Sequence, residues 1–153
     1  MAPDYRRASH SVFRLEVHVV WITKYRYKVL KGHIGHRLRD LIRRIATEEN
    51  VEIVSGTITP DHVHLLLSLD PSTAVSHIVK FMKGKTSRRL QMEFPDLRKR
   101  YWGQHLWARG YFAVSVGNVT KDMVTEYIKH HYEGTEGKDT FRIDDGTSTS
   151  SAK

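Results

Sequence analysis

The sequence predicts an α+β fold in which two helices cover one face of a four-stranded antiparallel sheet. Apolar residues recur at every second position in some segments and at helical spacing in others, in the order strand, helix, strand, strand, helix, strand, helix. The two middle strands are separated only by Pro60-Asp61, so they pair as an antiparallel hairpin. The 153 residues, 39% of them apolar, suffice for one core. We expect a split βαβ sandwich with an appended C-terminal helix, and a second sheet face left free for a ligand.

The first half of the chain supplies three strands and one helix. Residues 12–23 alternate between apolar and polar side chains, which is typical of a half-buried strand. Apolar residues in 34–49 keep helical spacing opposite several arginines. The β-branched run 51–58 and the run 62–69 then form the two strands of the hairpin.

The second half supplies a helix, a strand and a further helix. Residues 70–73 include types that cap helices, and helical spacing follows over 75–94. Aromatic and β-branched residues in 107–116 predict the fourth strand, with a glycine inside it. A third helix is expected between Thr120, which caps it, and Gly134, which stops it.

One domain is expected over residues 11–134. We expect residues 1–10 to form a flexible N-terminal segment. Residues 135–153 are rich in Gly, Ser, Thr and Asp, cannot bury much apolar surface, and are therefore expected to be disordered.

The composition restricts both the metal chemistry and the compartment. There is no cysteine, so a metal would have to be held by histidine, carboxylate or amide ligands. No apolar run approaches the roughly 18 to 20 residues that span a bilayer, and the polar N-terminus lacks the apolar core of a signal peptide. We expect a soluble, cytoplasmic protein.

The net charge of +8 is concentrated in one part of the chain. Residues 80–109 hold nine Lys or Arg against two carboxylates, a net charge of +7, interleaved with aromatic residues. This pattern favours nucleic acid over a membrane surface as the partner, because cations meet phosphates and aromatic faces stack on unpaired bases. The alternative is a solvated basic helix face followed by core aromatics, and a core role is favoured for Trp102 and Trp107. The candidate DNA contacts are Lys83, Lys85, Arg88, Arg89 and Arg109.

His62-Val63-His64 is the candidate metal site. On a strand, both imidazoles point to one face, while Val63 and Leu65 point to the other, towards the helices. We therefore expect the histidines on the free sheet face. A lone His-x-His is a weak signal, since histidines are common on surfaces, and a third ligand would have to come from another element.

The third helix could complete that site. Tyr127 and His131 stand one helical turn apart and project from the same side, so they could deliver a nucleophile and a ligand together. Tyr132 lies roughly 140° around the helix from Tyr127 and cannot share its site. The competing interpretation makes Tyr127 a core aromatic, and His130 and His131 a solvated helix end.

Several spaced motifs resemble the transposases of the IS200/IS605 insertion-sequence family. They occur in the same order over residues 11–134 and comprise Val20-Trp21-Ile22-Thr23-Lys24-Tyr25-Arg26, Thr59-Pro60-Asp61-His62-Val63-His64, Lys83-Gly84-Lys85-Thr86-Ser87-Arg88-Arg89-Leu90, the run from Trp102 to Phe112, and Tyr127-Ile128. The resemblance implies a ferredoxin-like or RRM-like core and a single-tyrosine HUH nuclease that works as a homodimer on single-stranded DNA with hairpins at the element ends.

The resemblance also implies residue roles. His62 and His64 match the paired metal ligands, and Tyr127 matches the nucleophile that forms a 5′-phosphotyrosine intermediate. His131 stands where the family usually has Gln or Asn, and a three-histidine set would shift preference from Mg²⁺ towards Mn²⁺. Gly117-Asn118 would let the tyrosine helix dock on a partner subunit, so that active sites are shared in the dimer.

Two alternatives remain open at this point. A related single-tyrosine nuclease acting on repetitive extragenic palindromes would share every catalytic residue. A non-catalytic RRM-like nucleic-acid binder would instead carry aromatics on the free face of its central strands. This chain has Glu16, His18, His62 and His64 there.

Overall fold

The structure is a computed structural model that describes residues 6–7 and 11–116. Residue contacts divide the chain into two units, Met1–Ser115 and Val116–Lys153, and the elements below belong to the first. In chain order they are β1 (Arg6–Arg7), β2 (Val12–Phe13), β3 (Leu15–Ile22), the 3₁₀ turn η1 (Lys24–Arg26), α1 (Gly32–Glu48), β4 (Glu52–Thr59), β5 (His62–Leu69), α2 (Val75–Glu93), α3 (Pro95–Arg100) and β6 (Phe112–Ser115). The predicted third helix and C-terminal tail lie outside the described residues.

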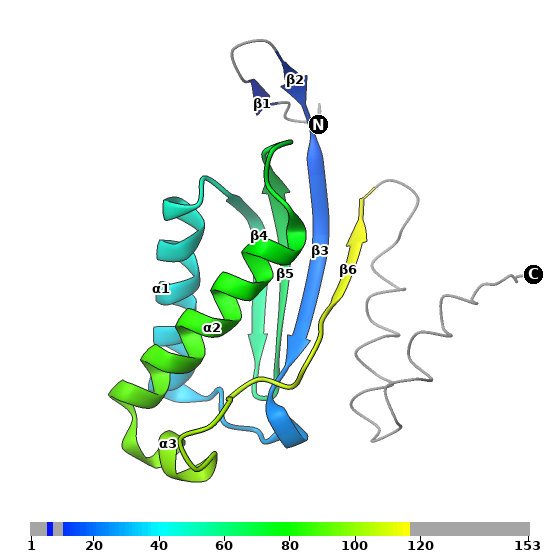
Figure 1. The fold of residues 1–153 in the computed structure, drawn as a ribbon. Coiled ribbons are helices and arrows are strands. Elements are labelled where there is room, and N and C mark those ends of the chain that lie inside the picture. The colour runs from blue at the N-terminus through cyan, green and yellow to red at the C-terminus, as the bar shows by residue number, and fades with distance from the viewer. Residues whose placement is uncertain (1–5, 8–10, 117–153) are drawn as a thin grey trace, which may run out of the picture. The chain divides into compact units, whose positions relative to one another are not determined.

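The main sheet has four antiparallel strands in the order β4-β5-β3-β6, and α1 and α2 lie on one side of it (Figure 1). The two central strands are therefore the first and third of the main sheet in chain order, which is the ferredoxin-like arrangement. The predicted α+β fold class is confirmed.

The core fills the space between that sheet and the helices. Val19 and Trp21 of β3 and Val63 of β5 are at most 1% exposed, and they meet apolar side chains of the helices, among them Leu38 and Met82. Alternation along the strands and helical spacing along α1 and α2 place these residues on facing surfaces. The periodicity in the sequence therefore predicted which side of β3 and of β5 faces the helices.

The fourth strand is shorter than predicted. Only Phe112–Ser115 pair with β3, while Trp107 makes an isolated bridge to Thr23. The indole of Trp107 packs edge-on against Trp21, with ring centroids 5.8 Å apart, and its Nε1 donates to Thr86 Oγ1 at 3.0 Å. The segment before β6 is thus held by these side-chain contacts and by single backbone hydrogen bonds, from Lys24 N to Leu106 O at 2.8 Å and from Ala108 N to Ile22 O at 2.9 Å, rather than by a continuous strand.

Two local predictions around α2 differ from the structure. Residues 70–73 form a turn in which Asp70 accepts from the backbone N–H and hydroxyl of Ser72, so they do not cap α2, whose N-cap is Ala74. The predicted end of α2 is confirmed at Glu93, but Pro95 starts a further helix, α3, that was not predicted, because proline is tolerated in the first turn of a helix.

The N-terminal segment contributes a small hairpin. Arg6–Arg7, within the range expected to be flexible, pair with Val12–Phe13, and Arg6 Nη1 donates to the carbonyl of Ser68 at 3.0 Å. The long first strand predicted for 12–23 is accordingly divided between β2 and β3.

Candidate functional site

The strand register places His62 and His64 on the sheet face opposite α1 and α2. His64 is opposite Val20 of β3, and His62 is opposite Ile22. Val63 between them points into the core and is fully buried. The predicted side of the sheet is confirmed, but this part of the face is not free as expected, because His18 and His62 are each only 7% exposed and Val20 is fully buried.

His62 is more enclosed than a surface histidine. It is only 7% exposed, and its Nδ1 lies 2.9 Å from Asp61 Oδ1 and 2.7 Å from Thr59 Oγ1. A carboxylate on one ring nitrogen fixes the tautomer and orientation of an imidazole and directs the other nitrogen to a ligand, an arrangement common around metal-binding histidines. These contacts of Nδ1 orient the His62 ring in the way that suits binding of a divalent cation through its other nitrogen. Asp61 and Thr59 received no role from the sequence, although both flank His62 in the hairpin turn.

A third histidine adjoins the pair. His18 of β3 is 7% exposed, and its Nδ1 lies 3.1 Å from Nε2 of His64, with the two rings tilted at 46°. One of these nitrogens must carry the proton for a hydrogen bond to form. A cation bound through Nε2 of His64 would compete with His18 for that lone pair. The alternation of β3 placed His18 on this face. A pattern within one strand could not show that His18 meets His64, which lies 46 residues away in the chain.

The described part of the chain holds two of the four residues of the predicted catalytic site, His62 and His64. Within residues 6–7 and 11–116, no group of three or more His, Cys, Asp or Glu side chains is arranged to hold a metal ion. Tyr127 and His131, the other members of the predicted site, lie outside the described residues. Their roles stay predictions.

The predicted DNA contacts do not form one surface. Lys83 Nζ donates to the carbonyls of Ala108 and Gly110 at 2.8 and 2.7 Å, and burial lowers the pKa of Lys83. Lys85 lies 3.8 Å from Glu48, and Arg89 Nε donates to Glu93 at 2.9 Å. These three cations already have partners within the protein.

Three of the predicted contacts, Lys83, Arg88 and Arg109, line one groove between α2 and the segment that precedes β6. The groove has a volume of about 1010 Å³, and its lining also includes Lys24, Arg98 and His105. It is the larger of two basic hollows beside α2, the other lying between α2 and α1 and including Lys85 and Arg89. We call the larger one the basic groove.

The two tryptophans of this region differ in burial. Trp107 is 5% exposed and belongs to the core, as expected, whereas Trp102 is 87% exposed. The core assignment was wrong for Trp102, because the turn after α3 gives it a left-handed backbone with φ of 58° and its side chain lies outside the core.

Similarity to known proteins identifies the class as transposase, a DNA-processing enzyme. The model of the IS200-like transposase family matches residues 11–131, and the chain belongs to this family. It is 37% identical over 130 residues to the ISDra2 transposase TnpA of Deinococcus radiodurans, covering 85% of this chain and 93% of that one. It is 32% identical over 130 residues to the IS200 transposase of Salmonella typhimurium, covering 85% of each.

Solved structures agree with the fold. A crystal structure described as that of a transposase from Deinococcus radiodurans matches with a TM-score of 0.74 and 36% identity, over 82% of this chain and 96% of the other. A REP-associated tyrosine transposase bound to a REP hairpin matches with a TM-score of 0.53 and 17% identity, over 87% and 75%, which shows the shared fold alone. Among the described helices, none has the length and apolar character required to cross a membrane.

Proposed function

We propose that this protein cuts and rejoins single-stranded DNA at insertion-sequence ends, with Tyr127 as the nucleophile and a divalent cation, Mg²⁺ or Mn²⁺, held by His62, His64 and His131. The observation that carries the proposal is the pair of histidines on one sheet face, with Nδ1 of His62 held 2.9 Å from the buried carboxylate of Asp61. Family membership supports the same reaction class.

The chemistry requires little of the protein beyond positioning. The phenol oxygen of Tyr127 attacks the scissile phosphorus, the bond from phosphorus to the 3′ oxygen breaks, and the products are a 5′-phosphotyrosine and a free 3′-OH. The cation, when bound, supplies charge neutralisation at the phosphate oxygens. Because a phenol has a pKa of about 10, Tyr127 must lose its proton as the attack proceeds. The phosphotyrosine bond conserves energy for strand joining.

The proposed substrate is a single strand that carries hairpins at the element ends, bound by a homodimer. The fold shared with a tyrosine transposase whose structure contains a REP hairpin is consistent with this kind of ligand. The basic groove, with Arg88 and Arg109 in its lining, supplies cations for the phosphates.

Cleavage of an end-labelled single strand, with trapping of the covalent protein–DNA adduct, tests the proposal. Tyr127→Phe, His62→Ala and His64→Ala should each abolish the adduct, as should chelation of the metal. Tyr132→Phe is the matched control and should keep activity, and His131→Gln should move the metal optimum towards Mg²⁺. Adduct formation by Tyr127→Phe would overturn the assignment of the nucleophile.

A further inference from the structure

We propose that an aromatic platform at one end of the sheet stacks unpaired bases of the single strand that this protein binds. The platform consists of Lys24, Tyr25, Tyr27, Arg100 and Tyr101, which ring contacts join, and of the exposed Trp102, which follows Tyr101 in the chain. It shares no residue with the histidine pair or with the predicted phosphate contacts of α2. The inference rests on the proposed function in one respect, namely that the ligand is single-stranded DNA.

The aromatic rings form a row that runs from the core to the surface. Tyr101 is 2% exposed, and its hydroxyl donates to the carbonyl of Lys24 at 3.3 Å. Its ring centroid is 5.5 Å from that of Tyr27, which in turn is 5.3 Å from that of Tyr25. Tyr25 is 66% exposed. The inner ring is thus anchored in the core, and the outer ring presents an open surface.

Backbone strain accompanies the exposure of these rings. Tyr25, Arg26 and Trp102 have φ angles of 62°, 54° and 58°, a left-handed conformation that is costly for residues other than glycine. Backbone hydrogen bonds hold it: Lys24 N donates to Leu106 O at 2.8 Å, and Trp102 N donates to Lys99 O at 3.2 Å. Strain that is maintained in order to expose large aromatic side chains indicates a binding role.

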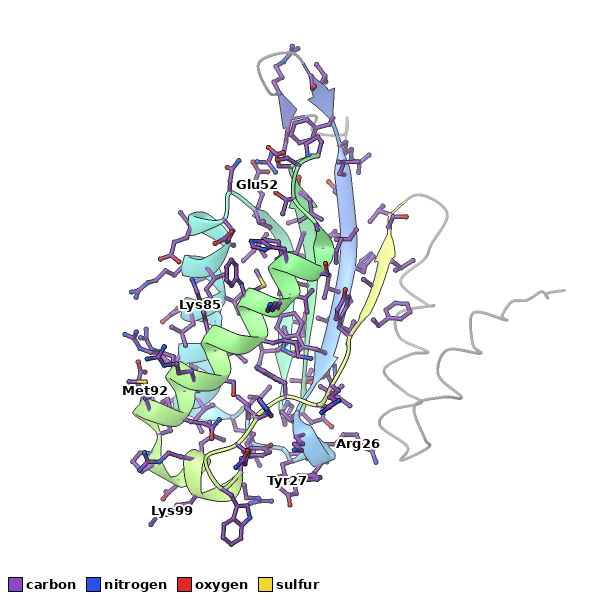
Figure 2. The ribbon with its side chains drawn as sticks, in the orientation of Figure 1. Arg26, Tyr27, Glu52, Lys85, Met92 and Lys99 are labelled. Carbon is purple, nitrogen blue, oxygen red and sulfur yellow. The ribbon has the colours of Figure 1, made fainter. Side chains whose placement is uncertain are left out.

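Cations surround the rings. The guanidinium carbon of Arg100 lies 4.0 Å from the centroid of Tyr27, and Lys24 Nζ lies 5.4 Å from that of Tyr25. In the described part of the chain, neither Arg100 nor Lys24 forms an ion pair with a carboxylate. Figure 2 shows Arg26 and Tyr27 at the same end of the unit as Lys99 of α3. A row of rings set among cations suits a ligand that is both aromatic and anionic, which describes a single strand.

The platform adjoins both the strand end that carries His62 and the basic groove. Thr23, which precedes η1, donates from its backbone N–H to the carbonyl of Asp61 at 2.9 Å, so the platform lies at the end of the sheet where β5 begins with His62. Lys24 also lines the basic groove. A strand whose phosphates follow the groove could therefore place its bases on the rings.

Trp102 is a natural reporter for this interaction. Trp21 and Trp107 are 1% and 5% exposed, and Trp107 also lines the basic groove, so the change in tryptophan emission assigned to Trp102 is the part that Trp102→Asn abolishes. The test uses the full-length protein in chelator, which prevents metal-dependent cleavage. The probes are a 12-nucleotide strand without self-complementarity, an abasic strand of equal length, and the corresponding duplex.

The ordinary strand should quench Trp102, while the abasic strand and the duplex should not. Measured by the fluorescence anisotropy of an end-labelled strand, Tyr25→Asn and Trp102→Asn should each weaken binding of the ordinary strand about tenfold, with an unchanged salt slope, since stacking neutralises no phosphate. Asparagine tolerates left-handed backbone, so both variants keep their fold. Phe81 lies on α2 and is not part of the platform, so Phe81→Leu, which also removes an aromatic ring, should bind the strand like the parent.

Three results would overturn the proposal that the platform stacks bases. They are no quenching by a saturating ordinary strand, equal quenching by the duplex, and a loss of affinity in the asparagine variants that is as large for the abasic strand as for the ordinary strand. The adduct assay distinguishes failure of the platform proposal from failure of the proposed function. An adduct without base-dependent quenching rejects the platform alone. Base-dependent quenching without an adduct supports the platform and rejects the proposed reaction.

Discussion

Asp61 is the residue whose contacts say most about the candidate metal site. Its carboxylate is 3% exposed, which is costly for a charged group unless it is hydrogen bonded, and it lies 2.9 Å from Nδ1 of His62. Thr59 approaches the same nitrogen at 2.7 Å. His62 therefore has a fixed ring orientation before any ligand arrives, which reduces the entropic cost of binding one.

Asp61→Asn should lower Mn²⁺ affinity by roughly 10- to 100-fold, because the amide no longer supports the basicity of the His62 ring. Titration calorimetry of the DNA-free protein with Mn²⁺ measures the effect without relying on cleavage. Asp70→Asn, in the turn before α2, is the control and should bind Mn²⁺ like the parent. Equal affinity in Asp61→Asn and the parent would remove Asp61 from the site.

Lys83 lines the basic groove, but its ammonium group also has partners within the protein. Its Nζ donates to the carbonyls of Ala108 and Gly110, which hold the segment before β6 against α2. Lys83→Met should cost about 2 kcal/mol in the free energy of unfolding, since hydrogen bonds to charged groups contribute roughly 1.5 to 3 kcal/mol. Urea denaturation measures this, with the exposed Lys80→Met as the control.

The salt dependence of single-strand binding distinguishes the two roles of Lys83. If it only clamps backbone, the log–log slope of affinity against salt should be the same in Lys83→Met and the parent. A slope that becomes shallower by roughly 0.7 would show that Lys83 neutralises a phosphate, as the sequence first indicated.

At the scale of elements, Glu93 links the two helices that cover the sheet. It accepts from Arg37 of α1 through two hydrogen bonds of 2.8 and 2.9 Å, and from Arg89 of α2 at 2.9 Å. These hydrogen bonds lower the pKa of Glu93 from its ordinary value of 4.5 to about 2. The charged form is thus favoured by folding, so its contribution is fully present above about pH 4.5 and is lost as the pH falls towards 2.

Glu93→Gln should therefore lower the urea midpoint of unfolding most near neutral pH. The difference in midpoint between the variant and the parent, called the gap below, should close as the pH falls from about 4.5 to about 2. Denaturation at several pH values measures the gap. Glu48→Gln is the matched control, because its carboxylate is 52% exposed and 3.8 Å from Lys85, and it should show little gap at any pH. A gap for Glu93→Gln that does not change with pH would contradict this account.

At the scale of the whole molecule, the proposed site draws on both halves of the chain. His62 and His64 lie in the first unit, whereas Tyr127 and His131 belong to the second. A site divided in this way can be assembled within one chain or between two subunits, and the resemblance to IS200/IS605 transposases implies exchange between subunits.

Mixing Tyr127→Phe subunits with His62→Ala/His64→Ala subunits should restore one active site per heterodimer if the sites are shared. The adduct assay measures the rescue, and differently tagged subunits show that heterodimers form. Each homodimer alone should stay inactive. Heterodimers without adduct would indicate that every site is assembled within one chain.

Much of the fold and part of the site followed from local patterns. The alternation of 62–69 placed His62 and His64 opposite the helices because successive strand residues point to opposite faces, and helical spacing identified α1 and α2. Such patterns depend only on the backbone period, so they can be read from neighbouring residues. The boundaries of β6 were missed because they depend on what residues 106–108 contact, and α3 was missed because six residues are too few to show a helical period.

What the sequence by itself determined is therefore the α+β fold, the family and the face on which His62 and His64 lie. Only the tertiary structure decided that His18 meets His64, that Lys83 is held by backbone carbonyls, and that Trp102 is exposed while Trp107 is buried. The physical reason is that burial and hydrogen-bond partners arise from segments distant in the chain, which the period of a single strand or helix does not record.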